Sequence, residues 1–483
     1  MAAIRLVETS LRDGNQSLWA ALGVDTARTL TVAPLIEAAG FKAIDFTTST
    51  HMGVAVRYKQ EDPWQRIRLM AAACPNTPLQ FLSTGFRFIS WETATPEFMA
   101  LAYKTLVTNG MLRFALADPM NDVAGNLAGA KMAKDGGADY VIGALVFTVS
   151  PIHDDAHYAE RARALAASPH VDALYIKDPG GLLTAQRAAT LIPAIQAVIG
   201  DKPLELHAHC TIGQADQSYL EGAALGVEAL QCASGAASDG TSNPPIERVI
   251  ANLKALGHTI DVDEDAVGRI CRYFDALAEA EDLPKGAPAA FDAAYYQHQL
   301  PGGMVGTMRR HLGEQRLTHL EGQVIEEIGR VREELGWPIV MTPFAQMVLT
   351  QAVMNVTGAE RYAVIPDEVM RYALGKFGRP NVPIADHVMD RIMSSPRARE
   401  LEAETGMADL AKLRARFGGR LSDEEFLLRA TMPADQVDAM REVADLGYDP
   451  RKSGAMNLLR DLLRRSDVET VSIARAGFRL ELS

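Results

Sequence analysis

The chain has 483 residues, 48% of them hydrophobic, which is enough for a large core and for two or three domains of ordinary size. Its 48 basic and 61 acidic residues give a net charge of −13, which argues against a nucleic-acid groove. The four cysteines form no Cys-x-x-Cys pair, so neither a disulfide framework nor a zinc ribbon is indicated. No stretch approaches the roughly 18 apolar residues of a membrane span, and no signal peptide precedes the first predicted strand. We therefore expect a cytoplasmic protein without a membrane span.

Short apolar runs alternate with longer segments of helical periodicity along the first half of the chain. The predicted strands are 4–10, 43–49, 79–85, 111–118, 140–148, 173–179, 204–210 and 229–235. The predicted helices between them are 26–39, 96–109, 124–135, 156–167, 184–198 and 215–222. This alternation indicates parallel strands with crossover helices, and eight such units over about 250 residues predict a TIM (β/α)8 barrel. A doubly wound sheet is the alternative, but no glycine-rich phosphate loop follows the first strand.

Four polar residues lie where predicted strands pass into loops, namely Asp13, Lys177, His207 and His209. The two histidines are two residues apart on one strand, so both side chains point to the same face. Imidazole and carboxylate ligands suit Zn, Mn or Co. Because the active sites of TIM barrels lie at the C-terminal ends of the strands, one barrel mouth would hold all four residues. By itself, Lys177 reads as an ordinary salt-bridged or snorkelling lysine.

Helical segments dominate the second half of the chain, at 263–280, 316–335, 343–355, 367–376 and 407–417. The polar, glycine-rich stretch 295–304 is either part of a site or a plain linker. Residues 470–482 read as two alternating strands about a turn. We expect a barrel domain at 1–265, a helical domain at 266–420 that completes the active-site funnel, and terminal helices with a short β-hairpin at 421–483.

Five motifs carry a resemblance to a known family: Thr9–Ser17 (TSLRDGNQS), Glu61–Trp64 (EDPW), Ile176–Leu183 (IKDPGGLL), His207–His209 (HAH) and His298–Gly303 (HQLPGG). The chain resembles the carboxyltransferase component of biotin-dependent 2-oxo-acid carboxylases, the group of pyruvate carboxylase, oxaloacetate decarboxylase α and the transcarboxylase 2-oxo-acid subunit. The resemblance covers nearly the whole chain. The first motif also occurs in the wider group of aldolase-like and acyl-transferring barrels that resemble hydroxymethylglutaryl-CoA lyase.

The resemblance implies that Lys177 is carboxylated and that its carbamate joins Asp13, His207 and His209 around a divalent metal. Carbamylation turns a cationic amine, which is a poor neighbour for a metal, into an anionic oxygen ligand.

The implied reaction is carboxyl transfer between carboxybiotin and an enolisable small carbonyl substrate such as pyruvate or oxaloacetate. Arg12 is expected to bind the carbonyl or enolate oxygen, unless it forms a surface ion pair beside the turn. Gln16 is expected to hydrogen-bond substrate or biotin, or else to order the turn that carries Asp13.

Two loops depart from the family pattern at the substrate end. After the third predicted strand the family typically has Leu-Arg-Gly-Gln-Asn, and this chain has Ser83-Thr84-Gly85-Phe86-Arg87. Thr84 therefore replaces the arginine expected to clamp the substrate carboxylate, and Arg87 could reach into the same mouth. After the second predicted strand His51 is either a new pocket residue or a surface histidine. We expect Thr84, Arg87 and His51 to lie at the substrate-binding end of the site.

A further departure follows the Pro-Gly-Gly motif, where the family usually has a Thr or Ser that shuttles a proton. Gly306 occupies that position, with Thr307 next to it as the candidate replacement. Neighbouring residues on a helix point about 100° apart, so the hydroxyl of Thr307 would not point where a side chain at position 306 would.

The segment Ala455-Met456-Asn457-Leu458 lacks the lysine of a biotin acceptor, so we expect no biotin-carrier domain and expect biotin to come from a separate carrier protein. A biotin carboxylase subunit is also expected as a partner, in a homodimer or larger complex. Two alternatives stay open. One is a biotin-independent metal-dependent lyase or decarboxylase of the same barrel superfamily, and the other is a non-catalytic scaffold subunit.

Overall fold

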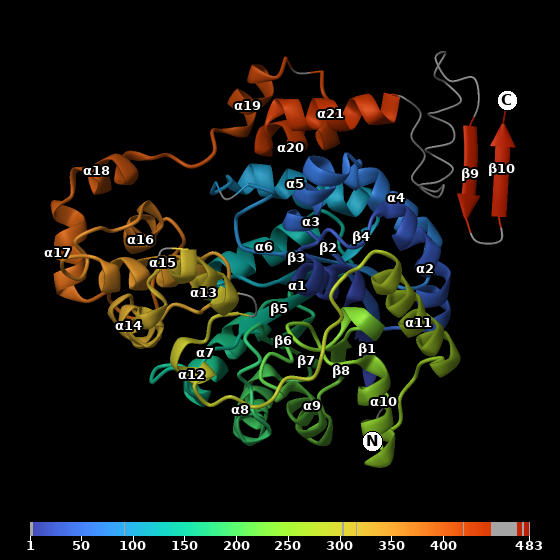
Figure 1. Ribbon diagram of the computed structural model, residues 1–483, viewed down its shortest axis with the longest axis horizontal. Coiled ribbons are helices and arrows are strands. Elements are labelled where there is room, and N and C mark those ends of the chain that lie inside the picture. The colour runs from blue at the N-terminus through green and yellow to red at the C-terminus, as the bar shows by residue number, and fades with distance from the viewer. Residues whose placement is uncertain are drawn as a thin grey trace.

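A closed barrel of eight parallel strands forms the first half of the molecule in a computed structural model, which describes residues 3–90, 92–301, 304–314, 316–418, 420–445, 471–475 and 478–482 (Figure 1). The strands follow one another around the ring in chain order: β1 (Arg5–Glu8), β2 (Ala43–Thr48), β3 (Leu79–Ser83), β4 (Met111–Leu116), β5 (Tyr140–Val146), β6 (Ala173–Asp178), β7 (Leu204–Ala208) and β8 (Ala229–Cys232). The TIM barrel predicted from the alternating pattern is confirmed, and the alternative of a doubly wound sheet is wrong.

Helices surround the barrel, most of them on its outside as the crossover pattern requires, and the short ones after β1 and β2 lie at its mouth. They are α1 (Asn15–Trp19), α2 (Thr26–Ala39), α3 (Ser49–Val54), α4 (Pro63–Ala73), α5 (Pro96–Thr108), α6 (Val123–Asp135), α7 (Asp155–Ala166), α8 (Ala185–Ile199), α9 (Ala215–Ala224), α10 (Ile246–Ala255) and α11 (Glu264–Ala280). Most of them begin at an Asp or Thr whose side chain accepts a backbone N–H of the first turn, among them Asp25, Asp62, Thr95, Asp122, Asp154 and Thr184.

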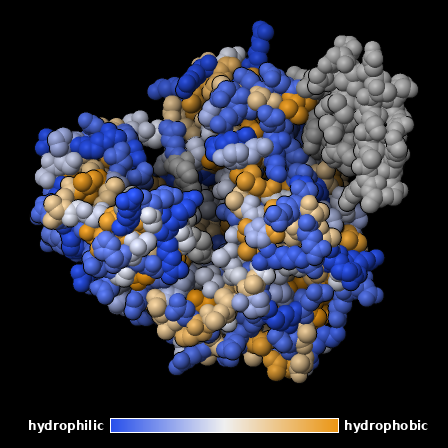
Figure 2. Space-filling model, in the orientation of Figure 1, coloured by the Kyte–Doolittle hydropathy of each residue, from blue (hydrophilic) through white to orange (hydrophobic). Residues whose placement is uncertain are grey.

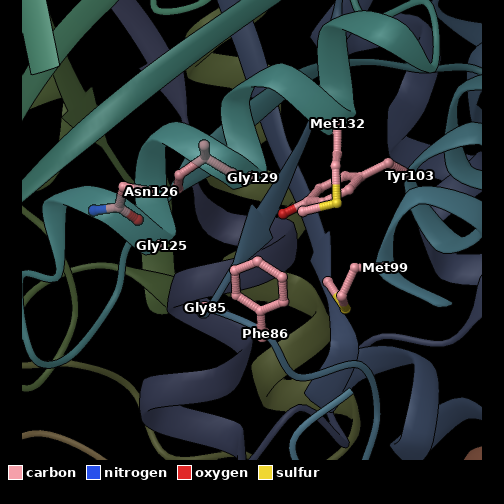
Figure 3. Close-up of a pocket in the computed structure, with 9 residues that line it drawn as sticks. Gly85, Phe86, Met99, Tyr103, Gly125, Asn126, Gly129 and Met132 are labelled. Carbon is pink, nitrogen blue, oxygen red and sulfur yellow. The ribbon is translucent and has the colours of Figure 1, made fainter. Parts of the chain in front are cut away.

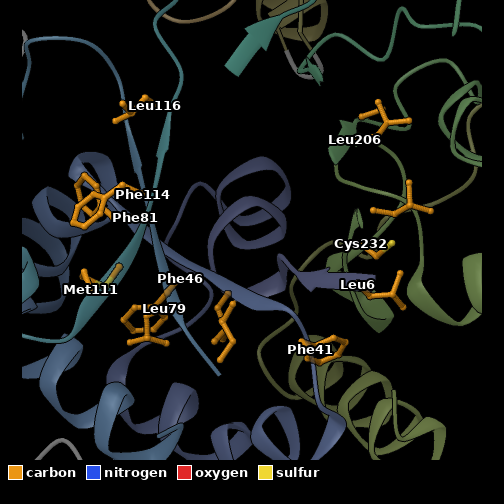
Figure 4. Close-up of a cluster of buried hydrophobic side chains, with 14 of the residues drawn as sticks. Leu6, Phe41, Phe46, Leu79, Phe81, Met111, Phe114, Leu116, Leu206 and Cys232 are labelled. Carbon is orange, nitrogen blue, oxygen red and sulfur yellow. The ribbon is translucent and has the colours of Figure 1, made fainter. Parts of the chain in front are cut away.

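The core of the barrel has an apolar outer layer and a polar interior. Large side chains such as Phe46, Phe81, Phe114 and Leu206 are buried between strands and helices (Figure 4). Inside the ring, a buried hydrogen-bonded network joins the following side chains: Arg12, Asp45, Gln80, Arg113, Glu205, Gln231 and His207. The apolar layer stabilises the fold, and the polar network reaches up to the mouth of the barrel.

A mostly helical region follows the barrel and has a hydrophobic cluster of its own, which includes Leu300, Val324, Phe344 and Val388. Its helices are α12 (Tyr295–His298), α13 (Met304–Glu314), α14 (Glu321–Glu334), α15 (Phe344–Thr357), α16 (Asp367–Ala373), α17 (Asp386–Ser394) and α18 (Pro396–Ala403). The helical character predicted for this half is confirmed. On the face shown in Figure 2, hydrophilic residues predominate and the surface is hollowed between this region and the barrel.

The last described helices, α19 (Leu410–Arg416), α20 (Asp423–Thr431) and α21 (Ala434–Asp445), return to the barrel. The ring of Phe426 lies 6.1 Å from that of Phe98 on α5, and both side chains belong to the hydrophobic cluster of the barrel. Strands β9 (Val471–Arg475) and β10 (Phe478–Leu482) pair antiparallel, as the alternating pattern of 470–482 predicts. Within the described ranges, no helix is long and apolar enough to cross a membrane.

Candidate active site

Asp13, His207 and His209 meet at the mouth of the barrel, with ligand atoms that all lie within 4.8 Å of one another. A buried π-helical turn, Ser10–Gly14, continues β1 and carries Asp13, and β7 with the residue after it carries the two histidines. Oδ2 of Asp13 lies 2.9 Å from Nε2 of His207 and 3.3 Å from Nε2 of His209. The spacing in the sequence therefore places two imidazoles and a carboxylate together, as expected.

The far nitrogen of each imidazole is held by an acceptor, which fixes the tautomer. Nδ1 of His209 lies 2.6 Å from the carbonyl oxygen of Thr241, an atom that can only accept. Nδ1 of His207 lies 2.9 Å from Oε1 of Gln231, whose amide nitrogen faces Glu205. Both Nδ1 atoms must therefore donate, so the neutral form of each ring has its lone pair on Nε2, the atom nearer Asp13.

Lys177 completes the cluster from the neighbouring strand, because the register of β6 and β7 pairs it directly with His207. Its Nζ lies 3.1 Å from Nε2 of His207 and 3.8 Å from Oδ2 of Asp13. Only 3% of Lys177 is exposed, and this burial lowers the pKa of its amine to about 8. About a tenth of the amine is therefore neutral at pH 7.

The charge of Asp13 is strongly stabilised. Burial raises the pKa of this carboxyl, but Arg12, His209 and Lys177 outweigh that effect and hold the pKa well below its usual value. Burial, with help from Lys177, lowers the pKa of His207 to about 3, so this imidazole is neutral. A carboxylate and neutral imidazoles are the forms that bind metal.

This donor set fits a divalent metal. Oδ2 of Asp13 is buried, with the two Nε2 atoms 2.9 and 3.3 Å away and the guanidinium of Arg12 3.1 Å away. The oxygen and the two nitrogens converge on one point, as the ligands of a metal do. One carboxylate oxygen and two imidazole nitrogens suit Zn, Mn or Co.

Arg12 and Gln16 lie beside the cluster. Arg12 is buried and donates from Nε to Oδ2 of Asp45 at 2.7 Å, while its terminal nitrogen lies 3.1 Å from Oδ2 of Asp13. Arg12 therefore forms buried ion pairs, and not the surface ion pair considered from the sequence. Oε1 of Gln16 is buried without a hydrogen-bond partner.

A cavity of about 310 Å³ opens above the cluster. Arg12, Asp13, Gln16, Lys177 and His209 line it from the barrel, and Pro301, Met304, Met341 and Thr342 line it from the helical region. The volume suits a small substrate.

Of the three residues expected at the substrate end, only Thr84 lines this cavity. Arg87 lines a neighbouring cavity of about 860 Å³, where it donates to the carbonyl oxygen of Lys376 at 3.2 Å. His51 lies in α3 and is 3% exposed, so it is not a surface histidine, and burial holds the pKa of its imidazole well below the usual value. Neither Arg87 nor His51 is among the residues that line the cavity over Asp13.

The proton-shuttle position falls on α13. Gly306 is an exposed residue of this helix, and a Cβ built on it meets no atom within 4 Å. The side chain of Thr307 lies outside the described residues, as do Gly302 and Gly303.

Another cavity, beside the loop after β3, is lined by Gly85, Phe86, Met99 and Tyr103 and measures about 10 Å³ (Figure 3). It has room for one water at most and carries no cluster of reactive groups.

Several residues of the site were not expected from the sequence. Gln231 and Thr241 hold the imidazoles, and Asn243 lies 3.3 Å from Nε2 of His207. Asp45 holds Arg12. Asp45 and Gln231 are polar residues within predicted strands, and that pattern signals an inward-facing position in a barrel. Thr241 acts through its backbone, which no side-chain pattern reveals.

Fold and site together define a TIM-barrel enzyme with residues that could hold a metal ion at the C-terminal mouth of the barrel. A family model described as "HMGL-like" matches residues 3–272, and one described as "Conserved carboxylase domain" matches residues 295–471. The chain belongs to the HMGL-like family, in the group that also carries the conserved carboxylase domain.

Three known proteins illustrate the relationship. A pyruvate carboxylase subunit of Methanocaldococcus jannaschii is 33% identical, over 81% of this chain and 68% of that protein. The methylmalonyl-CoA carboxyltransferase 5S subunit of Propionibacterium freudenreichii subsp. shermanii is 29% identical, over 98% of this chain and 94% of that protein. The solved structure of the carboxyl transferase domain of Rhizobium etli pyruvate carboxylase with pyruvate matches at a TM-score of 0.84 and 21% identity, covering 100% of this chain and 83% of that chain.

Proposed function

We propose that this chain is the carboxyltransferase component of a biotin-dependent carboxylase or decarboxylase. It moves a carboxyl group between biotin and an enolisable small carbonyl substrate. The observation that carries the proposal is the buried Lys177, whose Nζ lies 3.1 Å from Nε2 of His207 beside the Asp13 carboxylate. An ordinary structural lysine would find a carboxylate at hydrogen-bond distance, whereas its nearest carboxylate oxygen here is 3.8 Å away.

Lys177 is proposed to carry a carbamate. Its neutral amine attacks CO2, the Nζ–C bond forms as one C–O π bond opens to give the carboxylate, and the proton released from the amine passes to water. The low pKa of Lys177 supplies the neutral amine, and its burial protects the product from water. Asp13, His207, His209 and the carbamate of Lys177 would hold the divalent metal.

The remaining residues act on the substrate in the 310 Å³ cavity. When bound, the metal supplies a Lewis acid that polarises a carbonyl and stabilises an enolate. Arg12 donates to the developing oxyanion, held in place by Asp45. Gln16 presents its unpartnered Oε1 to substrate or biotin.

Biotin is proposed to arrive on a separate carrier protein, and a biotin carboxylase subunit is proposed as the source of its carboxyl group. The assembly would be a homodimer or larger. We further propose that residues 1–265, 266–420 and 421–483 are the three domains, with the funnel formed where the second meets the barrel mouth.

The test is carboxyl transfer from carboxylated free biotin, or from a carboxylated carrier, to a panel of 2-oxo acids and neutral carbonyl compounds. We expect transfer by the wild-type protein, loss in Lys177→Ala, and wild-type rates in Lys131→Ala, a matched lysine in an exposed ion pair on α6. Failure of a metal-loaded, folded protein with every acceptor would contradict the proposal.

A second function is favoured by one observation: Gly306 offers no side chain at the expected shuttle position. A biotin-independent lyase or decarboxylase with the same enolate chemistry would not need that group. Turnover in the absence of any biotin protein, unaffected by avidin, would identify this alternative.

A further inference from the structure

We infer that the far end of the substrate cavity is built for an uncharged, hydrogen-bonding group of the substrate, such as an amide, ester or neutral carbonyl, and not for a carboxylate. This inference rests on the proposed function and specifies its substrate class. Three features support it: the strand order of the barrel, the charges of the residues that line the cavity, and the hydroxyl groups at its far end.

The topology defines which residues face the cluster across the mouth. In a closed ring of eight strands in chain order, β2 lies across from β6 and β3 lies across from β7. Lys177 and His209 belong to the β6 and β7 side, so a substrate that reacts beside them extends toward the loops after β2 and β3. Ser49, the first residue of α3 after β2, and Thr84, in the loop after β3, line the cavity.

The charges of the cavity are already balanced. Among the described residues that line it, Arg12 and Lys177 are the only arginine and lysine side chains. Arg12 is paired with two carboxylates, those of Asp13 and Asp45. Lys177 is 3.8 Å from Asp13, and as a carbamate it would add a negative charge. No described lining residue at the far end can therefore neutralise a buried carboxylate, and an unpaired one is costly.

The nearest arginine in the loop after β3 is held elsewhere. The guanidinium of Arg87 donates to the carbonyl oxygen of Lys376 and stacks over the ring of Phe377, with its carbon 4.8 Å from the ring centre. It thus joins the barrel to the helical region and lines the neighbouring cavity.

The far end does offer hydrogen bonds. The Oγ atom of Ser49 is buried and has no partner, and Thr84 lines the same cavity. A buried hydroxyl without a partner is unusual and points to a ligand. Apolar side chains, Leu82, Met304 and Met341, line the cavity around these groups. Hydroxyls between apolar walls recognise a neutral polar group better than an ion.

A matched ligand pair tests the inference: pyruvate and its neutral isostere pyruvamide, which share the methyl ketone. Binding to the purified wild-type protein is measured by titration calorimetry, and enolisation is measured as deuterium exchange of the methyl group. We expect pyruvamide to bind at least about tenfold more tightly than pyruvate. Tighter or equal binding of pyruvate, or binding of neither ligand, would overturn the inference.

Variants sharpen the test. Thr84→Arg should reverse the preference toward pyruvate by at least about tenfold, because it adds the missing cation. Ser49→Ala should weaken pyruvamide several-fold and leave pyruvate unchanged. Thr31→Arg, on an exposed position of α2, adds the same charge away from the site and should change neither affinity. An unchanged preference in Thr84→Arg would also overturn the inference.

The ligand preference is measured without biotin, so it is independent of the proposed carboxyl transfer. A protein that prefers pyruvamide but transfers no carboxyl group from carboxybiotin would contradict the proposed function alone. A protein that carboxylates pyruvate in preference to neutral acceptors would contradict this inference alone.

Discussion

Lys177 and His207 are direct partners across the β6–β7 pair, and this register places Nζ of the lysine 3.1 Å from Nε2 of the imidazole. Two strands thereby present an amine and an imidazole to the same point at the barrel mouth. Asp13, from the turn after β1, approaches both groups. The site is thus set by backbone pairing, which is more rigid than a loop.

The amide of Gln231 should control metal affinity through His207. In Gln231→Leu the imidazole loses the acceptor that fixes its tautomer, so we expect metal affinity to fall by about 10- to 100-fold while the fold is kept. Equilibrium dialysis with Zn, Mn and Co measures the change. Gln323→Leu, at an exposed position on α14, is the matched control. Unchanged affinity in Gln231→Leu would show that the tautomer is set in another way.

Gly14 should be required for the position of its neighbour Asp13. A Cβ on Gly14 would lie 2.4 Å from the backbone oxygen of Ala237, so Gly14→Ala must displace the turn. We expect weaker metal binding although every ligand is retained. Gly322→Ala, where a Cβ meets nothing within 4 Å, should behave as wild type. Metal binding by Gly14→Ala at wild-type strength would contradict this expectation.

The buried pair of Glu205 and Arg113 should support stability. Both carboxylate oxygens of Glu205 accept from Arg113 at 2.7 Å. Glu205→Gln leaves the guanidinium buried without a counter-charge, which typically costs about 3–5 kcal/mol. Urea unfolding at pH 7 measures the loss, with exposed Glu279→Gln as the control. A loss under about 1 kcal/mol would mean that the interior network compensates.

The same pair predicts a pH dependence. Burial raises the pKa of Glu205, but Arg113 and Lys42 outweigh it and lower the pKa from 4.5 to about 2. Because the pKa of Glu205 is lower in the folded protein than in the unfolded chain, its carboxylate stabilises the fold above pH 4.5, and this stabilisation is lost as the pH falls toward 2. Wild type should therefore lose about 3 kcal/mol more than Glu205→Gln between pH 5 and pH 2. Parallel acid curves for the two proteins would contradict the assignment.

The sequence predicted the parts of this molecule that depend on local periodicity. All eight strands were located, because buried parallel strands read as short apolar runs between helices. His207 and His209 were recognisable because side chains two residues apart on any strand point to the same face, whatever the fold. Arg87 was harder, since its contact with Phe377 joins two segments far apart in the sequence and depends on how the helical region packs. The partners Gln231 and Thr241 likewise depend on tertiary distance.

The most direct test of the central claim is 13C NMR of the purified protein equilibrated with 13CO2 and a divalent metal. The account predicts a carbamate resonance in the wild type and in Lys131→Ala, and none in Lys177→Ala. Without metal and at a fixed CO2 pressure, the initial rate of carbamate formation should rise about tenfold from pH 7 to pH 9, because the pKa of Lys177 is about 8 and only the neutral amine reacts. A wild-type protein without a carbamate resonance, or a resonance that survives in Lys177→Ala, would contradict it.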